Sequence, residues 1–149
     1  MKSKFYLLLL VPALMLSSCT KWIPDTQANI VGNWELVSVE RYGPYGSEPI
    51  YSEYEYGEFY FGNNGTARYS DNYGQMDGSW RLIDRSDGYH DYYGNYRTGA
   101  RTSMELRLYD YYDSRVIEWE FYSIELSGNH LVGYMNRFGY DYRYEFRRY

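Results

Sequence analysis

The sequence predicts an all-β domain, an eight-stranded antiparallel up-and-down β-barrel over residues 30–149. Apolar and polar residues alternate with a period of two through most of this stretch, which is typical of strands that bury one face. Turn sequences such as GNNG at 62–65 and SGN at 127–129 separate the alternating runs. No segment carries a sustained apolar stripe of helical period, so the predicted barrel has no C-terminal helix.

The alternating runs divide residues 30–149 into eight segments. The predicted strands are 30–42, 52–61, 65–73, 76–84, 102–111, 114–126, 129–137 and 140–149. The sixth strand changes phase after Phe121, since Ile124 and Leu126 fall on the other parity. A β-bulge near Tyr122–Ser123 would explain the change.

Closure of the sheet follows from the problem of its edges. Eight consecutive antiparallel strands with short connections leave two exposed edges, and closing them into a barrel removes both. An open meander or a sandwich is the alternative. The 22 tyrosines suit such a sheet, because tyrosine favours strands and buries a ring while its hydroxyl reaches water or a partner.

The N-terminus has the features of a lipoprotein signal peptide over residues 1–18. Two lysines precede an apolar run at 5–16, which is too short for a bilayer that takes about 20 residues. The following LSSC at 16–19 resembles the lipobox of bacterial lipoproteins, and this resemblance implies lipidation of Cys19. The alternative is an ordinary signal peptide that happens to contain a cysteine.

Residues 19–29 are predicted to form a lipidated tether that holds the domain at the membrane. An aspartate directly after the lipidated cysteine would favour retention at the inner membrane. This chain has Thr20 at that position, so it resembles an outer-membrane lipoprotein. No acidic run follows the cysteine, so the periplasmic face is expected. Cys19 is the only cysteine, so disulfides cannot staple the fold.

Composition excludes some partners. The formal charge is −5 for the full chain, and removal of the two signal-peptide lysines brings it to −7. An acidic domain without a basic patch is not expected to bind nucleic acid. An aromatic content of 21% argues against disorder. The protein is expected to be a monomer.

Three sequence segments carry a family resemblance. They are GNW at 32–34, DGSWRLID at 77–84 and IEWEFYSIELSGNHLVGYM at 117–135. With the lipobox and the strand pattern, they resemble the lipocalins, and more closely the lipocalin-like lipoproteins of the Bacteroides group. The resemblance covers residues 30–149 and implies a small-ligand barrel. A lipocalin carries a helix after its last strand, whereas this chain has none after Tyr149.

The resemblance also implies a plug at one end of the barrel. In lipocalins the tryptophan of the G-x-W step closes the barrel, and an arginine of the last strand packs across it. The matching residues here are Trp34 and Arg148, and strand parity also directs Arg148 inward. A cation over an indole contributes about 0.5–2 kcal/mol. A solvated terminal arginine is the alternative.

The interior predicts a non-catalytic protein that binds a small apolar or amphipathic ligand. The loop at 41–51 is expected at the open mouth, and the tyrosine-rich loop at 85–100 at the plugged end. A barrel filled by its own side chains, acting as an envelope protein- or glycan-interaction module, is the alternative. The inward candidates for the ligand lining are Leu36, Phe59, Phe61, Trp80, Leu82, Met104, Leu106, Leu108, Ile117, Trp119, Phe121, Tyr142 and Tyr144.

No catalytic or metal chemistry is predicted. His90 lies near Asp87 and Asp91, but a metal needs three or four convergent ligands. Glu118 and Glu120 share a strand face about 7 Å apart, a separation that a carboxylate pair of a glycosidase could use. They lie on the solvated face opposite Trp119, so neither an enzyme nor a cofactor is expected.

Overall fold

The computed structural model describes residues 25–43, 45–91 and 93–149. The predicted signal peptide, Cys19 and most of the tether lie outside the described residues. Within them, no helix is long and apolar enough to cross a membrane.

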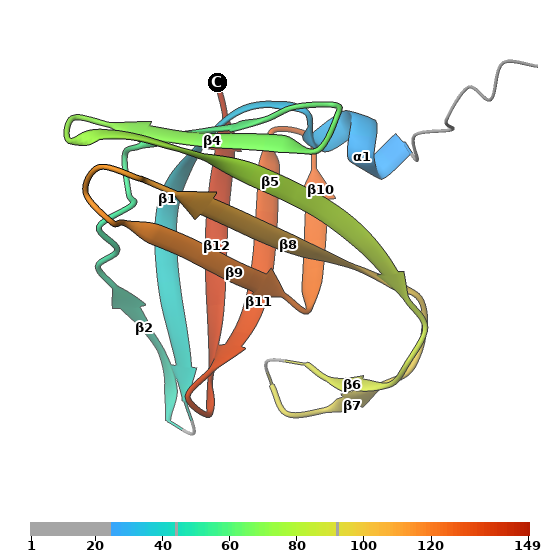
Figure 1. The fold of residues 1–149 in the computed structure, drawn as a ribbon. Coiled ribbons are helices and arrows are strands. Elements are labelled where there is room, and N and C mark those ends of the chain that lie inside the picture. Colours follow the sequence, from blue (N-terminus) through green and yellow to red (C-terminus); the bar gives the residue numbers. More distant parts are fainter. Residues whose placement is uncertain (1–24, 44, 92) are drawn as a thin grey trace, which may run out of the picture.

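The described chain is one short helix followed by antiparallel strands (Figure 1). The elements are α1 (Asp25–Ile30), β1 (Gly32–Gly43), β2 (Gly46–Ile50), β3 (Glu58–Phe61), β4 (Thr66–Asp71), β5 (Gly74–Arg85), β6 (Tyr89–His90), β7 (Tyr96–Arg97), β8 (Arg101–Tyr109), β9 (Val116–Phe121), β10 (Ser123–Ser127), β11 (His130–Arg137) and β12 (Tyr140–Arg148). This confirms the predicted all-β antiparallel class.

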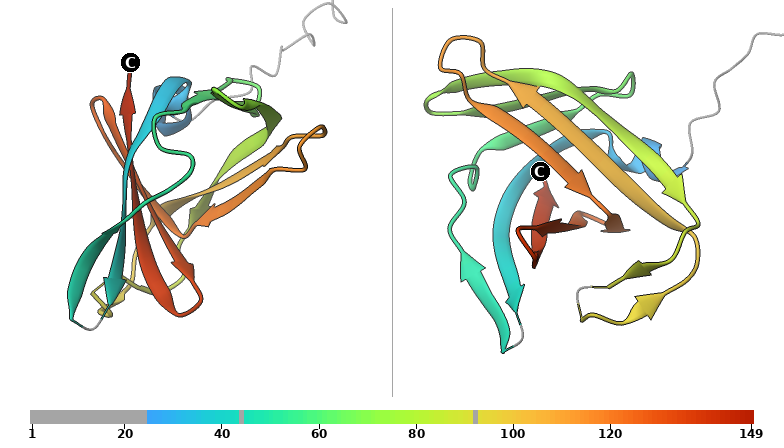
Figure 2. Two further views of the ribbon diagram at one scale, coloured as in Figure 1. Left: turned by 90° about the vertical axis from the view of Figure 1, so that its left-hand side faces the viewer. Right: turned by 60° about the horizontal axis from the view of Figure 1, so that its bottom comes forward.

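The main sheet has ten strands. Its order is β10-β11-β12-β1-β3-β4-β5-β8-β9, with β2 paired to β1 beside this path, while β6 and β7 form a separate hairpin. Figures 1 and 2 show the sheet curled, so that β9 crosses in front of β11 and β12. The predicted count of eight strands is therefore not what the pairing gives.

The ladder is also not closed into a barrel in the described residues. β9 pairs with β8 and β10 pairs with β11, so the two ends of the path are consecutive in the chain. Only Tyr122 separates them, at the position where the change of phase predicted a bulge. The Tyr122 amide donates to the Tyr134 carbonyl at 2.9 Å, which holds the bend on β11.

β1 is the central strand of the sheet. It pairs with β12 along one edge, and along the other edge its first part pairs with β3 and its second part with β2. Its register against β12 shifts between Leu36 and Ser38. The shift changes the parity of β1, so that Leu36 and Val39 are both buried. The edge of β1 beyond the bulge is free to pair with β2.

The concave face of the sheet is filled with aromatic rings. Trp119 of β9 lies 5.7 Å from Phe59 of β3 and 4.9 Å from Tyr144 of β12, measured between ring centroids. Phe146 of β12 and Phe59 meet edge to face at 5.5 Å. These contacts join strands from opposite parts of the path, and they account for one continuous core.

Three segments differ from the predictions. Residues 41–51 are not a loop, because β1 runs on to Gly43 and β2 pairs back along it. The predicted strand 52–61 is a strand only over Glu58–Phe61, and turns precede it. The end of the predicted tether is the helix α1, whose Ile30 is fully buried in the core. Tertiary packing thus decides each of these stretches over the local pattern.

The 85–100 segment holds the β6–β7 hairpin, and the prediction of its place was wrong. Figure 1 shows the hairpin at the lower right, below the β5 and β8 ends from which it springs and away from α1. Tyr89 packs on Tyr122 at 5.9 Å between centroids. Arg101 donates to the Tyr122 carbonyl at 2.9 Å and to the Asp87 carbonyl at 2.6 Å, which folds the hairpin against β10 and β11.

Candidate functional site

A cavity of about 440 Å³ opens at the end of the sheet where the β1–β2 hairpin and the β11–β12 turn lie. We call it the mouth pocket. It is framed by the stretch after β2 and the turn before β12. Its lining residues are Val39, Ile50, Tyr51, Ser52, Glu53, Tyr54, Trp119, Arg137, Phe138, Tyr142 and Tyr144.

The floor of the mouth pocket is aromatic. Trp119 rises from β9 and is 4% exposed, with Tyr144 beside it. Tyr54 packs edge to face on Trp119 with 5.6 Å between centroids, and on Tyr69 at 5.5 Å. A third ring therefore comes from the turn segment before β3 and covers the indole. The floor offers an apolar, polarizable surface with little freedom to move.

Tyrosine hydroxyls supply the polar groups of the mouth pocket. Burial and the neighbouring Glu53 carboxylate raise the pKa of Tyr54 to about 12. Burial also raises the pKa of Tyr144, against the opposing charge of Arg137. Both phenols are therefore neutral at physiological pH, and each can donate or accept a hydrogen bond.

The rim of the mouth pocket holds one cation next to an exposed ring. The Arg137 guanidinium lies 5.2 Å from the centre of the Phe138 ring. Among the described residues no carboxylate lies within ion-pair distance of Arg137. Phe138 is 84% exposed and adopts a φ of 54°, followed by Gly139 at 80°. Two successive positive φ values define a type I′ hairpin turn, in which a bulky residue at the first position is strained.

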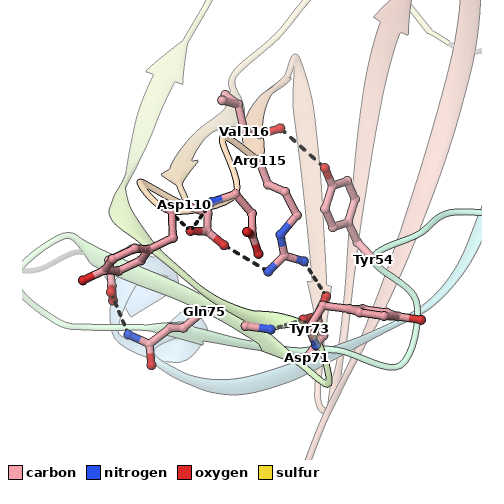
Figure 3. Close-up of polar contacts among 11 residues, drawn as sticks. Tyr54, Asp71, Tyr73, Gln75, Asp110, Arg115 and Val116 are labelled. Atoms are coloured by element: carbon pink, nitrogen blue, oxygen red, sulfur yellow. Dashed lines mark hydrogen bonds and ion pairs between the residues drawn. The ribbon is translucent and has the colours of Figure 1, made fainter.

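A partly buried ion cluster joins the remaining mouth turns (Figure 3). Arg115, on the β8–β9 turn, contacts Asp71 at 2.8 Å and Asp110 at 3.3 Å. Asp71 ends β4, so the β4–β5 and β8–β9 turns are joined. Burial opposes the charged form of Asp71, yet Arg115 and two backbone amides lower its pKa. The amides of Tyr112 and Asp113 lower the pKa of Asp110, with a further contribution from Arg115.

Tyr54 links this cluster to the mouth pocket. Its hydroxyl is 3.5 Å from the Val116 carbonyl at the start of β9, as Figure 3 shows. Arg115 is the residue before Val116, so the ring that covers Trp119 is attached to the segment that Arg115 clamps. The rim and the floor are therefore mechanically connected.

At the opposite end, the structure places Trp34 and Arg148 as neighbours. They are paired across β1 and β12, and the Arg148 guanidinium lies 4.6 Å from the indole centre. The indole NH donates to the Ile30 carbonyl at 2.7 Å, and Arg148 donates to the Asn29 carbonyl. The C-terminal end of α1 thus covers Trp34, which is fully buried.

The predicted lining residues separate into three groups. Trp119, Tyr142 and Tyr144 line the mouth pocket. Trp80 and Leu82 border a different hollow of about 600 Å³ that reaches Gln27 of α1, with the Arg81–Glu105 ion pair in its wall. The others are packed inside the sheet and exposed by 2% or less: Leu36, Phe59, Phe61, Met104, Leu106, Leu108, Ile117 and Phe121.

Several residues of the mouth pocket are not among those predicted from the sequence. Val39 was not predicted because the β1 bulge changes its parity, and Ile50 because strand β2 was not expected. Tyr54 was placed in a strand that begins only at Glu58. Phe138 carries a usable signal, because the glycine of RFG at 137–139 favours a tight turn. A ring at such a turn must be exposed unless something covers it.

The residues considered for other chemistry lie apart. Among the residues that the structure describes, no three His, Cys, Asp or Glu side chains are grouped so as to hold a metal. Glu118 and Glu120 are exposed, and Glu118 accepts a hydrogen bond from the Tyr109 hydroxyl at 2.9 Å. His90 packs against Tyr96 with 5.3 Å between ring centres.

Comparison of the chain with protein-family models, curated proteins and solved structures finds no match. The site must therefore be interpreted from its own geometry.

Proposed function

We propose that the protein is a lipid-anchored cell-envelope barrel that binds a small apolar or amphipathic ligand in the mouth pocket, without catalysis. The observation that carries the proposal is the pocket itself: an aromatic floor under neutral hydroxyls, about 440 Å³ in volume. Ligand sites are typically of about 300–1,000 Å³, mostly apolar and with few polar groups for orientation.

The proposal includes an eight-stranded closed barrel. β9 and β10 are consecutive, so a single strand bent at Tyr122 would pair with β8 through its first half and with β11 through its second. With these two counted as one strand and β2 as an addition to β1, the path has eight members. Packing of Phe121 on Tyr144 at 5.4 Å supports this view, because it brings β9 onto β12 from inside.

The filled interior restricts the ligand to the mouth. Leu106, Leu108 and Phe59 are fully buried behind Trp119, so in the described residues side chains fill the core beneath the floor. The ligand would lie over the indole with its polar group towards Arg137 and the tyrosine hydroxyls. A fatty acid or another amphiphile with an anionic head group matches this arrangement.

Attachment to the membrane is part of the same proposal. Lipid on Cys19 would hold the domain at the outer membrane on its periplasmic face, as a monomer. A protein tethered beside a bilayer meets amphiphiles at high local concentration, which suits a shallow pocket of moderate affinity.

A fluorescence titration tests the binding proposal. Fatty acids, sterols and aryl compounds are added to the protein while tryptophan emission is recorded, and the series is repeated with Trp119→Phe. We expect a saturable change for amphiphiles that is lost in Trp119→Phe, because Trp119 is the only indole that lines the mouth pocket in the described residues. The absence of a saturable change across the panel refutes the proposal.

A second candidate function rests on a different observation. Every turn at the mouth end carries an exposed aromatic side chain, and Tyr45, Tyr73, Tyr112 and Phe138 are each at least 84% exposed. Such rings favour contact with a glycan or a protein partner. A filled barrel that presents these rings to an envelope partner would bind it through the rim, with no small ligand in the mouth pocket.

A further inference from the structure

A second aromatic site lies on the outside of the sheet, between the β6–β7 hairpin and strands β10 and β11. A cavity of about 260 Å³ opens there, and we call it the outer cage. It is separate from the mouth pocket, and no residue lines both. Its lining residues are Tyr89, Asp91, Tyr93, Arg97, Tyr122, Ser123, Glu125 and Tyr134.

The tyrosine rings of the outer cage converge from three elements. Tyr122 comes from the β9–β10 bend, with Tyr89 of β6 at 5.9 Å and 47° on one side. Tyr134 of β11 lies at 6.4 Å and 32° from the Tyr122 ring. The three rings therefore lie together in the wall of the cavity.

The hairpin tip that carries Tyr93 is well fixed. The Asp91 carboxylate accepts hydrogen bonds from the amides of Tyr93 at 3.0 Å and Asn95 at 2.9 Å. It also pairs with Arg97 at 2.8 Å. These contacts hold the backbone at Tyr93, whose ring lines the cavity and is 70% exposed.

The charge around the outer cage favours a cation. Each nearby guanidinium already has a carboxylate: Arg97 has Asp91, and Arg143 has Glu145 at 2.9 Å. Glu125 lines the cavity and has no ion-pair partner among the described residues. Burial and the Glu125 charge raise the pKa of Tyr134, while burial, Asp141 and Asp91 raise that of Tyr122. Arg143 opposes the shift of Tyr134, but in the described part of the chain the two carboxylates that line the cavity, Asp91 and Glu125, outnumber its one lining cation, Arg97.

One ring of the outer cage already binds a cation. The Arg101 guanidinium lies 4.3 Å from the centre of the Tyr89 ring. Arg101 does not line the cavity, so it leaves the enclosed space open to another group. In addition, the Tyr122 hydroxyl is buried and has no hydrogen-bond partner among the described residues.

We propose that the outer cage binds an organic cation, specifically a quaternary ammonium head group of the choline type. Such a group spreads its charge over methyl groups, which contact ring faces without loss of strong hydration. The cavity is too small for a drug-sized ligand, but it suits a head group. The inference does not depend on the function proposed for the mouth pocket.

The test is an NMR titration of the full-chain protein with ¹³C-labelled tyrosine, in a detergent without choline head groups. Choline and tetramethylammonium chloride are the probes, and 3,3-dimethyl-1-butanol is the neutral isostere of choline. We expect both cations to shift the ring signals of Tyr122 and Tyr134, and the isostere to bind about threefold to tenfold more weakly than choline. Equal binding of the isostere, or no shift with either cation, overturns the proposal.

Variants separate recognition from folding. Tyr93→Leu should weaken choline binding about threefold to tenfold, whereas Tyr96→Leu, an exposed ring on β7 outside the cavity, should leave it unchanged. Glu125→Gln should weaken choline binding but not binding of the isostere. Unchanged choline affinity in both Tyr93→Leu and Glu125→Gln contradicts the proposal. Binding of glucose in place of the cations also contradicts it.

Discussion

Replacement of Trp34 probes the plugged end of the sheet. The side chain is fully buried, and its indole NH donates to Ile30 while its face lies under Arg148. Truncation to alanine removes a buried tryptophan, which costs about 3–5 kcal/mol of unfolding free energy. Because small domains are stable by only about 5–15 kcal/mol, Trp34→Ala is expected to lose a large share of the unfolding free energy.

Two contacts of Trp34 contribute separately to this free energy. Trp34→Phe keeps a ring but loses the bond to the Ile30 carbonyl, which contributes about 1 kcal/mol. Arg148→Met keeps the aliphatic stem and loses the charge over the indole, which is worth about 0.5–2 kcal/mol. The double variant Trp34→Ala/Arg148→Met should therefore lose less stability than the two single variants added together.

Urea unfolding followed by far-UV circular dichroism measures these free energies. The method does not depend on the emission of the tryptophan that is removed. Unchanged m values would show that the comparison is valid. An unchanged unfolding midpoint in Trp34→Ala, or strict additivity in the double variant, would refute the plug.

Three further predictions concern the sheet and its mouth. Gly78→Ala should destabilise the protein by about 1–3 kcal/mol in urea unfolding, because a Cβ there would lie 1.9 Å from the Arg107 carbonyl oxygen of β8. Gly43→Ala, with open space around it, is the control and should change little. Arg115→Met should lower the unfolding free energy by about 2 kcal/mol at pH 7. It should also flatten the pH dependence of the thermal midpoint. The lowered pKa values of Asp71 and Asp110 stabilise the wild type at neutral pH, and this contribution is lost as the pH falls through their folded-state pKa values. Equal acid sensitivity of both proteins would contradict that. Phe138→Asn should raise the unfolding free energy by about 0.5–1 kcal/mol, because asparagine accepts the positive φ, and weaken ligand binding at the mouth; a destabilised variant would show that the turn is not strained.

The parts of the fold that the sequence predicted are those with a strict period. Ile117, Trp119 and Phe121 of β9 alternate with acidic and tyrosine residues. Their side chains are buried in the core. The phase change after Phe121 located the bend between β9 and β10 to within a residue. In these segments one buried face dictates the pattern, so burial can be read directly from the alternation.

The parts that the sequence did not predict depend on contacts between distant residues. β2 contains Pro49 and Gly46 and has no alternating pattern, but it finds a free edge of β1 past the bulge. Tyr54 looked like a strand residue and instead covers Trp119. The fold-back of the β6–β7 hairpin rests on Tyr89 and Arg101 meeting the β9–β10 bend, a contact that no local pattern encodes.

The location of a bound amphiphile tests the central proposal most directly. In a methyl-labelled sample, titration with laurate should shift the signals of Val39 and Ile50, which line the mouth pocket. Leu106 in the core and Ile30 at the plugged end, both fully buried, should not shift. Saturable shifts confined to Val39 and Ile50 are the predicted result. Shifts centred on Ile30, or no shift at all with laurate and the other amphiphiles of the panel, would contradict a ligand site at the mouth.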